Sequence, residues 1–330
     1  MQDGTPLKLK IAVANYGHTA PLKNGSVSID GVEPDFVKVE PIIAAFRRMV
    51  RDVEFDVCEI ASTTYFIARA YGRPFKALPI FLMRNFHHGG IVCREDANIR
   101  TPKDLERKNV GVRAYSVTTG VWTRGILAAE YGLDLSKVTW VVDDEEHVME
   151  LKLPKNVVHV PEGKSLVSMM AAGELQAGFT ANAGIGREGP PKEGWGGGAK
   201  APPQVYHDLI PDVAPLEEAW YKRTGVFPMH GVLVVKDELI ARHPWLVKSL
   251  YRAFTEAKQQ YLAGLRAGEG DTPNDRRYRK LKPLVGSDPL PYGMKHNLPA
   301  INMLIDIAMQ QGLMPRRLSL DELFVDPDAL

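Results

Sequence analysis

The sequence predicts an α/β protein with two domains. Short apolar runs that are typical of strands alternate along the chain with longer stretches whose apolar residues recur at helical spacing. This alternation indicates sheets covered by helices. A chain of 330 residues is also long enough for two hydrophobic cores.

The expected strands are runs rich in Val, Ile, Leu and Phe that are bounded by Gly, Pro or polar residues. They are 7–15, 35–39, 55–61, 75–81, 91–94, 109–112, 138–142, 157–160, 177–182 and 226–235, with a turn or short hairpin at 26–31.

The expected helices follow these strands. They are 41–52, 62–72, a helix that begins at Thr101, 117–131, 165–172, 216–224, one long helix over 237–266, and 297–311. Thr101 caps its helix with Pro102 in the first turn, and Gly132 ends the helix that begins near Val117. The Gly- and Pro-rich stretch 184–203 is expected to be a loop or flap, and 267–275 a polar loop.

Composition and charge exclude some classes of partner. The chain has 41 basic and 40 acidic side chains, a net charge of +1, so neither nucleic acid nor a membrane surface is an expected partner. No apolar stretch approaches the length of a membrane span, and the first ten residues contain no hydrophobic leader. We expect a cytoplasmic protein that binds a small molecule. The sequence leaves a homo-oligomer open. Cys58 and Cys93 lie in apolar runs and are expected to be reduced core residues.

The stretch from Asn109 to Arg124 is typical of a strand, a polar turn and a helix. Its turn carries one arginine and several hydroxyls, namely Arg113, Tyr115, Ser116, Thr118 and Thr119. A helix N-terminus presents free N–H groups and a positive dipole end, which suit a carboxylate or phosphate. The simpler interpretation is that Ser116 only caps the helix.

Polar residues also follow other predicted strands. Ligands of open α/β sheets bind at the carboxyl ends of strands. The residues at such ends are Asn15, Tyr16, Glu59, Ser62, Thr63, Arg113, Tyr115, Ser116, Thr180 and Asn182. No Gly-rich phosphate-binding motif is present in the sequence, which argues against a nucleotide ligand.

Several motifs resemble a known family. T-P-x-D-L at 101–105 before N-V-G-V at 109–112 is similar to the second lobe of type II periplasmic-binding-protein folds. Further motifs resemble the 4,5-dihydroxyphthalate decarboxylase family almost from end to end. They are I-D-G-V at 29–32, F-D-V-C-E at 55–59, P-I-F-x-x-R-x-F-x-H at 79–88, L-K-L-P at 151–154, T-G-V-F-P-M-H at 224–230 and D-P-L-P-Y-G at 288–293.

The resemblance implies a two-lobed type II periplasmic-binding-protein-like fold with two crossing strands and the ligand in the cleft between the lobes. Lobe I would be 1–97 and 229–330, and lobe II would be 98–228. The chain departs from the family at 181–187, A-N-A-G-I-G-R, where the family carries a Gly-Pro-Arg-type segment. This departure leaves the exact ring substrate open.

The family activity implies decarboxylation of a hydroxylated aromatic dicarboxylate, with 3,4-dihydroxybenzoate and CO2 as products. A phenolate para to the carboxylate enriches the ring carbon, and a general acid protonates that carbon. The hypothesis assigns the acid role to His88 or His230. Glu59 would take the phenol proton or orient a histidine. Substrate binding is assigned to Arg84, Arg113, Tyr115, Ser116, Thr118, Thr119, Asn15, Tyr16 and Asn182.

The alternatives stay open at this point. No cofactor is expected, although His88, His230 and Glu59 could instead hold a divalent metal that chelates a catechol. Each of these side chains could also be structural, and the acidic run 143–146 is expected to be a solvated turn. The rival function is a binding protein for a small aromatic or heterocyclic carboxylate without turnover.

Overall fold

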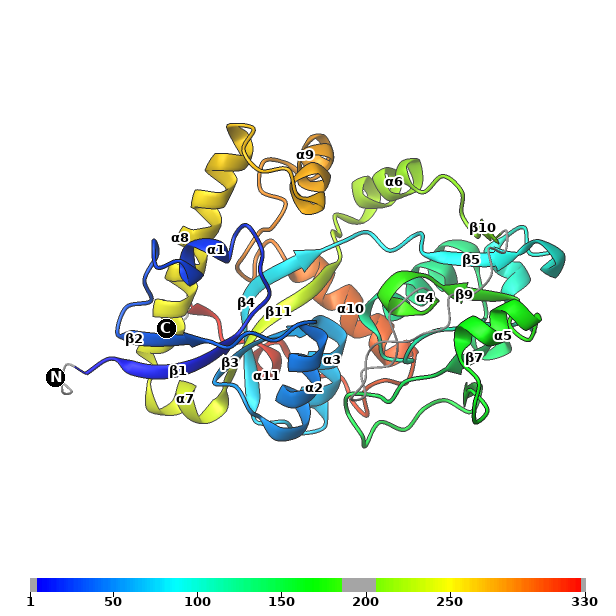
Figure 1. Ribbon diagram of the computed structural model, residues 1–330, viewed down its shortest axis with the longest axis horizontal. Coiled ribbons are helices and arrows are strands. Elements are labelled where there is room, and N and C mark those ends of the chain that lie inside the picture. The colour runs from blue at the N-terminus through cyan, green and yellow to red at the C-terminus, as the bar shows by residue number, and fades with distance from the viewer. Residues whose placement is uncertain (1–4, 186–205, 328–330) are drawn as a thin grey trace. The chain divides into compact units, whose positions relative to one another are not determined.

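Figure 1 shows the computed structural model of the chain, which describes residues 5–185 and 206–327. It comprises two compact units. Unit 1 is Met1–Arg84, Met229–Ile301 and Arg317–Leu330, and unit 2 is Asn85–Pro228 and Asn302–Arg316.

The first boundary lies at residue 84 and not at the expected residue 97. The reason is that strand β5 (Ile91–Arg94) pairs with strands of unit 2. The segment 302–316 likewise belongs to unit 2, although we expected it in lobe I.

Unit 1 contains a five-stranded mixed sheet in the order β2-β1-β3-β11-β4. The strands are β1 (Leu7–Ala12), β2 (Val32–Phe36), β3 (Val57–Ala61), β4 (Phe75–Arg84) and β11 (Met229–Lys236). β1 runs parallel to β2 and β3, whereas β11 is antiparallel to β3 and β4. The carboxyl ends of β1 and β3 therefore meet at one edge.

Helices cover both faces of this sheet (Figure 1). They are α1 (Ala20–Lys23), α2 (Ile43–Asp52), α3 (Ser62–Ala70), α7 (Asp237–Arg242), α8 (Trp245–Arg266) and α11 (Leu320–Leu323). Helix α9 (Pro273–Val285) packs against α8 instead, through Tyr278. Side chains alternate along a strand, so β4 serves two cores. One face buries Leu78, Ile80 and Leu82 with apolar residues of α8, and the other packs Phe75 and Phe81 in an aromatic group with Tyr65, Phe66 and Phe324.

Unit 2 contains a six-stranded sheet in the order β10-β5-β9-β6-β7-β8. The strands are β5, β6 (Asn109–Gly111), β7 (Thr139–Val142), β8 (Val157–His159), β9 (Ala177–Phe179) and β10 (Tyr206–Asp208). Its helices are α4 (Thr118–Tyr131), α5 (Leu166–Ala172), α6 (Ala214–Thr224) and α10 (Leu298–Gln310) from Asn302 onward, with 3₁₀ turns at Glu95–Ala97, Pro102–Leu105, Leu135–Lys137 and Ala181–Ala183. α4 packs closely against α10, since a Cβ at Gly125 would lie 2.6 Å from the Ile307 side chain.

Three expectations about helices are corrected. The long helix over 237–266 is broken into α7 and α8, because Pro244 has no N–H to donate and disfavours a helical His243. The helix expected at Thr101 is a single 3₁₀ turn, although its capping box is present. Helix α9 was missed, and it begins inside the expected polar loop. The flap expected at 184–203 lies outside the described residues from 186 onward.

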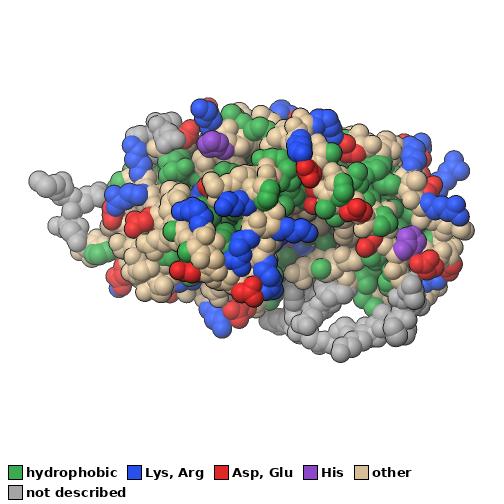
Figure 2. All heavy atoms as spheres, turned by 90° about the horizontal axis from the view of Figure 1, so that it is seen from above, with side chains coloured by type: hydrophobic (Ala, Val, Ile, Leu, Met, Phe, Trp, Pro, Cys, Tyr) green, Lys and Arg blue, Asp and Glu red, His purple; other side chains and the backbone are tan. Residues whose placement is uncertain are grey.

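Cys58 and Cys93 are buried and unpaired, as expected. No helix among the described residues is both long and apolar enough to cross a membrane. Basic and acidic side chains both occur across the face shown in Figure 2, in keeping with the net charge of +1.

Candidate functional site

In unit 1 Glu59, in the middle of β3, meets Tyr16, which lies in the segment that follows β1. The Glu59 side chain is buried, with 1% of the residue exposed. One carboxylate oxygen accepts the Ala14 N–H at 3.0 Å, and the other accepts the Tyr16 hydroxyl at 2.7 Å. The expectation that polar residues gather near the carboxyl ends of strands thus predicted the association of Tyr16 with Glu59.

Strand β11 makes room for this carboxylate. Leu233 lies opposite Glu59, and Gly231 lies two residues away on the same face. A Cβ at Gly231 would lie 2.9 Å from a Glu59 oxygen, which is too close for a side chain.

Burial dominates the electrostatics of the pair. It raises the pKa of Glu59, while the hydrogen bonds from Ala14 and Tyr16 and the charge of Lys23 oppose the rise. Burial also raises the pKa of Tyr16 well above its usual value, and the neighbouring Glu59 raises it further. Perturbed pKa values in a cluster are typical of functional sites.

The ring of Tyr16 is held by His18. The two rings stack with centroids 5.0 Å apart and planes within 5°. His18 is 1% exposed, and burial lowers its pKa to about 3, so its imidazole is neutral at pH 7.

The sequence did not indicate a second buried group of unit 1. Lys258 of α8 donates to Asp288 at 2.6 Å and to the Leu290 carbonyl at 2.9 Å, and its ammonium lies 4.2 Å from the ring centroid of Tyr292. Burial lowers the pKa of Lys258, and Asp288 opposes this. These residues lie far from Glu59 in sequence, so no local motif predicts their association.

Arg84, expected to clamp substrate, is buried at the end of β4. Its guanidinium donates to the Asn297 side chain and to the Pro291 carbonyl, the latter at 3.4 Å. The structure therefore assigns Arg84 a role in fixing the segment 291–297.

Asn15 and His230 were also assigned to the site from the sequence. Asn15 is exposed, and its side-chain oxygen accepts a hydrogen bond from Lys23 at 2.6 Å. His230 lies at an irregularity of β11, between Met229, which pairs with Arg84, and Gly231, which pairs with Met83.

In unit 2 the turn after β6 holds a carboxylate, but the carboxylate belongs to the chain itself. Glu146 accepts the Tyr115 N–H at 2.7 Å, the Ser116 N–H at 3.2 Å and the Ser116 hydroxyl. These are the donors that the sequence assigned to substrate. The simpler expectation that Ser116 caps the helix is wrong, since the N-cap residue of α4 is Val117 and no side-chain hydrogen bond is made there.

The acidic run 143–146 is not a solvated turn. Asp144 and Glu146 are buried, and Asp144 pairs with Arg113 at 3.3 Å. The Asp144 N–H also donates to the Arg113 carbonyl at 3.0 Å. Burial raises the pKa of Glu146, and the hydrogen bonds from Ser116 and Tyr115 oppose the rise. The run is buried because its carboxylates satisfy donors of the 113–116 turn.

Arg124, missed by sequence reasoning, supports the same turn. It is fully buried, its guanidinium lies 3.9 Å from the Tyr115 ring centroid, and it donates to the Tyr115 carbonyl. Its Nε donates to Gln311 at 2.9 Å.

His88 lies in an aromatic pocket of unit 2. Its ring centroid is 5.2 Å from Trp220 and 6.4 Å from Phe86. Neither ring nitrogen has a hydrogen-bond partner among the residues that the structure describes. Burial lowers the pKa of His88 to about 4, so it is a neutral imidazole at pH 7.

The remaining predicted residues surround the start of α4. Thr118 is buried and Thr119 is half-buried in the first turn of α4. Asn182 is exposed on the 3₁₀ turn after β9, and the neighbouring Ala183 carbonyl accepts the Arg113 N–H at 2.7 Å.

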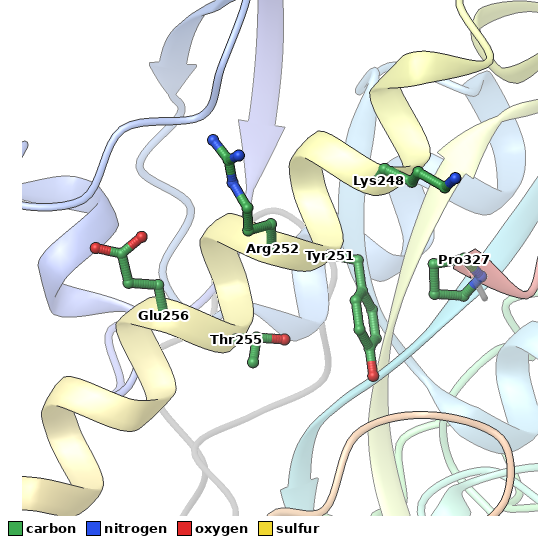
Figure 3. Close-up of a pocket in the computed structure, with 6 residues that line it drawn as sticks. All are labelled: Lys248, Tyr251, Arg252, Thr255, Glu256 and Pro327. Carbon is green, nitrogen blue, oxygen red and sulfur yellow. The ribbon is translucent and has the colours of Figure 1, made fainter. Parts of the chain in front are cut away.

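The described residues contain no group of three or more His, Cys, Asp or Glu side chains placed to hold a metal ion. A pocket of about 450 Å³ lies beside α8, lined by Lys248, Tyr251, Arg252, Thr255, Glu256 and Pro327 (Figure 3). None of the residues assigned from the sequence lines this pocket.

Comparisons with known proteins give two curated relatives. The chain is 34% identical over 334 residues to a 4,5-dihydroxyphthalate decarboxylase of Comamonas testosteroni, covering 96% of each chain. It is 40% identical over 179 residues to the protein of that name from Pseudomonas putida, covering 52% of this chain and 69% of the relative.

The fold is similar to that of the periplasmic aliphatic sulphonate binding protein SsuA of Escherichia coli. The TM-score is 0.53 at 12% identity, covering 98% of this chain and 93% of that one. This likeness confirms the expected periplasmic-binding-protein-like fold. No protein-family model matches the chain.

Proposed function

The chain belongs to the 4,5-dihydroxyphthalate decarboxylase family, and from that membership we propose that it decarboxylates a hydroxylated aromatic dicarboxylate such as 4,5-dihydroxyphthalate. The products would be 3,4-dihydroxybenzoate and CO2. The observation that carries the proposal is the 34% identity that extends over 96% of both chains.

The proposed reaction is ring protonation without a cofactor. A phenol of the substrate loses its proton toward Glu59, the ring carbon gains a proton, and the bond to CO2 breaks. The buried pair of Glu59 and Tyr16 supports this role, because a carboxylate with a raised pKa is a better base.

The proton donor is proposed to be His88 or His230. His88 is neutral at pH 7 in this structure, so it would need a neighbouring substrate carboxylate to raise its pKa. Its two buried ring nitrogens have no hydrogen-bond partner in the described part of the chain. This supports the proposal that they bind a ligand.

Anchoring of the retained carboxylate is proposed for Arg113, Thr118 and Thr119. The donors of Tyr115 and Ser116 are already bound to Glu146, so they would serve only if Glu146 moved away. Arginine suits the task because its planar group matches a carboxylate.

The test is to mix purified protein with 4,5-dihydroxyphthalate and to follow CO2 release and the ultraviolet spectrum, with and without a chelator. We expect turnover to 3,4-dihydroxybenzoate in both arms. Loss of turnover with the chelator would favour the divalent-metal alternative, and tight binding without CO2 would favour the binding-protein alternative.

Variants test the proton donor. Loss of a general acid lowers turnover by about 10²–10⁴-fold. Turnover should therefore fall by this factor in His88→Asn or in His230→Asn, whichever removes the acid. His243→Asn, a histidine between α7 and α8, is the matched control and should keep full turnover. Full turnover in both of the first two variants would refute the acid assignment.

A further inference from the structure

Tyr16 is the more exposed member of its hydrogen-bonded pair with the buried carboxylate of Glu59. Glu59 is 1% exposed, whereas Tyr16 is half-buried. One Glu59 oxygen accepts the Ala14 N–H and the other accepts the Tyr16 hydroxyl, and Gly231 leaves no spare room beside it. A substrate hydroxyl therefore reaches the Tyr16 oxygen more readily than it reaches Glu59.

The direction of the hydrogen bond leaves Tyr16 able to accept. Its hydroxyl hydrogen points to Glu59 at an oxygen–oxygen distance of 2.7 Å. A phenolic oxygen both donates and accepts hydrogen bonds. Within residues 5–185 and 206–327, no side chain or backbone N–H donates a hydrogen bond to the Tyr16 hydroxyl oxygen.

The ring is held in place for this function. His18 stacks on Tyr16 at 5.0 Å, and the Tyr16 N–H donates to the Thr19 hydroxyl at 2.9 Å. Because the stacked His18 is itself fully buried, the Tyr16 hydroxyl has little freedom to leave Glu59.

We propose that Tyr16 is a catalytic residue that relays a proton from a substrate phenol to Glu59, with His18 as a positioning residue. This inference rests on the proposed function, and it adds that Glu59 removes the phenol proton through Tyr16. The ligand class is a phenol or catechol whose hydroxyl donates to the Tyr16 oxygen.

The protons balance over one turnover, in which the general acid regains its proton from water. The phenol O–H bond breaks and a new O–H bond forms on Tyr16, while the original Tyr16 hydrogen moves to Glu59. The phenolate then supports loss of CO2, and the general acid supplies the hydrogen that replaces CO2 on the ring. Before product leaves, the proton on Glu59 returns through Tyr16 to the phenolate.

Burial supports the direction of the relay. It raises the pKa of Glu59, which strengthens the carboxylate as a base. It raises the pKa of Tyr16 as well, so Tyr16 stays protonated and acts as a relay rather than as a standing phenolate.

The test compares Tyr16→Phe, Glu59→Gln and the double variant. Tyr16→Phe keeps the stacked ring and removes the hydroxyl, so kcat should fall by about 100-fold or more while KM changes less than about tenfold. Because the two groups act in series, the double variant should be within about threefold of the slower single variant. Multiplicative losses, or a Tyr16→Phe variant with kcat within about threefold of wild type, would overturn the relay.

Tyr261→Phe is the matched control. Tyr261 also donates to a carboxylate, that of Asp275 at 2.5 Å, and its ring lies 5.8 Å from His18. It should keep kcat within about twofold. An equal loss in this variant would mean that kcat responds to any broken tyrosine–carboxylate pair in this region, and it would overturn the relay.

A binding measurement separates failure of the relay from failure of the proposed function. Wild-type protein mixed with 3,4-dihydroxybenzoate should show the longer-wavelength ultraviolet band of a catecholate, and Tyr16→Phe should not. If wild type shows no turnover but the band depends on Tyr16, the proposed function fails and the relay stands. If wild type and Tyr16→Phe have equal turnover or show the same ultraviolet band, the relay fails.

Discussion

Glu146 shows how a carboxylate of the chain can occupy donors that a local motif assigns to a ligand. The motif indicated anion binding at Tyr115 and Ser116, and the structure has an anion there, bound through both N–H groups and one hydroxyl. The chemistry was predictable from the turn. The occupant was not, because it comes from about 30 residues further along the chain.

The same limit applies across the candidate site. Tyr16 and Glu59 were predictable because Tyr16 follows β1 and Glu59 lies within the neighbouring parallel strand β3, close to where β1 ends. Lys258 and Arg124 were not, since a charged residue within a helix indicates a solvated face until its burial is known. Arg84 was assigned to substrate because nothing local reveals its bond to Asn297.

Ser116→Ala tests whether Ser116 serves the fold or the substrate. The hydroxyl donates to the buried Glu146, and hydrogen bonds to charged groups contribute about 1.5–3 kcal/mol. We expect the free energy of unfolding to fall by about 1–3 kcal/mol in urea titrations while KM stays within about twofold. A tenfold rise in KM with unchanged stability would show that substrate displaces Glu146.

Ser136→Ala is the matched control for that substitution. Ser136 also donates to a carboxylate, that of Asp134 at 2.6 Å, but both residues are at the surface. Its removal should change stability by less than about 0.5 kcal/mol.

At the scale of elements, most strands were predicted, but β10 was missed, β2 lies at Val32–Phe36 rather than at 35–39, and some helices were also missed. Apolar runs indicated the strands because most strand side chains are buried. Gly132, in the left-handed conformation, ends α4 where expected. Helix α9 was missed although Thr272, Pro273 and Asp275 form a readable start with a capping box. Few apolar residues follow that start, so periodicity gave little signal.

Strand β11 offers a test of how closely an element must fit its site. A methyl group at Gly231 would lie 2.9 Å from a Glu59 oxygen that two hydrogen bonds hold in place. Gly231→Ala should therefore push the carboxylate from Tyr16, lower turnover by about 100-fold or more, and lower stability by about 1–3 kcal/mol, as overpacking does. Steady-state kinetics and urea unfolding measure the two effects.

Gly264→Ala on α8 is the control. A methyl group there would lie 2.7 Å from a carboxylate oxygen of Glu269, but this side chain is exposed and can move. Alanine is also the better helix former by about 0.5–1 kcal/mol. Turnover should be unchanged and stability equal or higher, and a loss equal to that of Gly231→Ala would refute the explanation from the fixed carboxylate.

At the scale of the whole molecule, each unit buries a histidine that stays neutral. Burial lowers the pKa of His18 in unit 1 to about 3 and that of His88 in unit 2 to about 4, from an ordinary value of 6.5. Above pH 6.5 these histidines are neutral in the folded and the unfolded chain alike. As the pH falls below 6.5, the unfolded chain binds protons that the folded chain does not, so stability is lost.

We therefore expect wild-type stability to fall as the pH is lowered from 7.5 to 5. At pH 5 each histidine contributes a loss of about 2 kcal/mol, because 1.5 pH units correspond to about 1.36 kcal/mol per unit. Urea unfolding of wild type, His18→Asn and His88→Asn at both pH values measures this. In each variant the fall in the free energy of unfolding from pH 7.5 to pH 5 should be about 2 kcal/mol smaller than in wild type, whatever the stability of the variant at pH 7.5. An unchanged pH dependence in His18→Asn would mean that this imidazole is charged in the folded chain, and the neutral stacked ring beside Tyr16 would then be wrong.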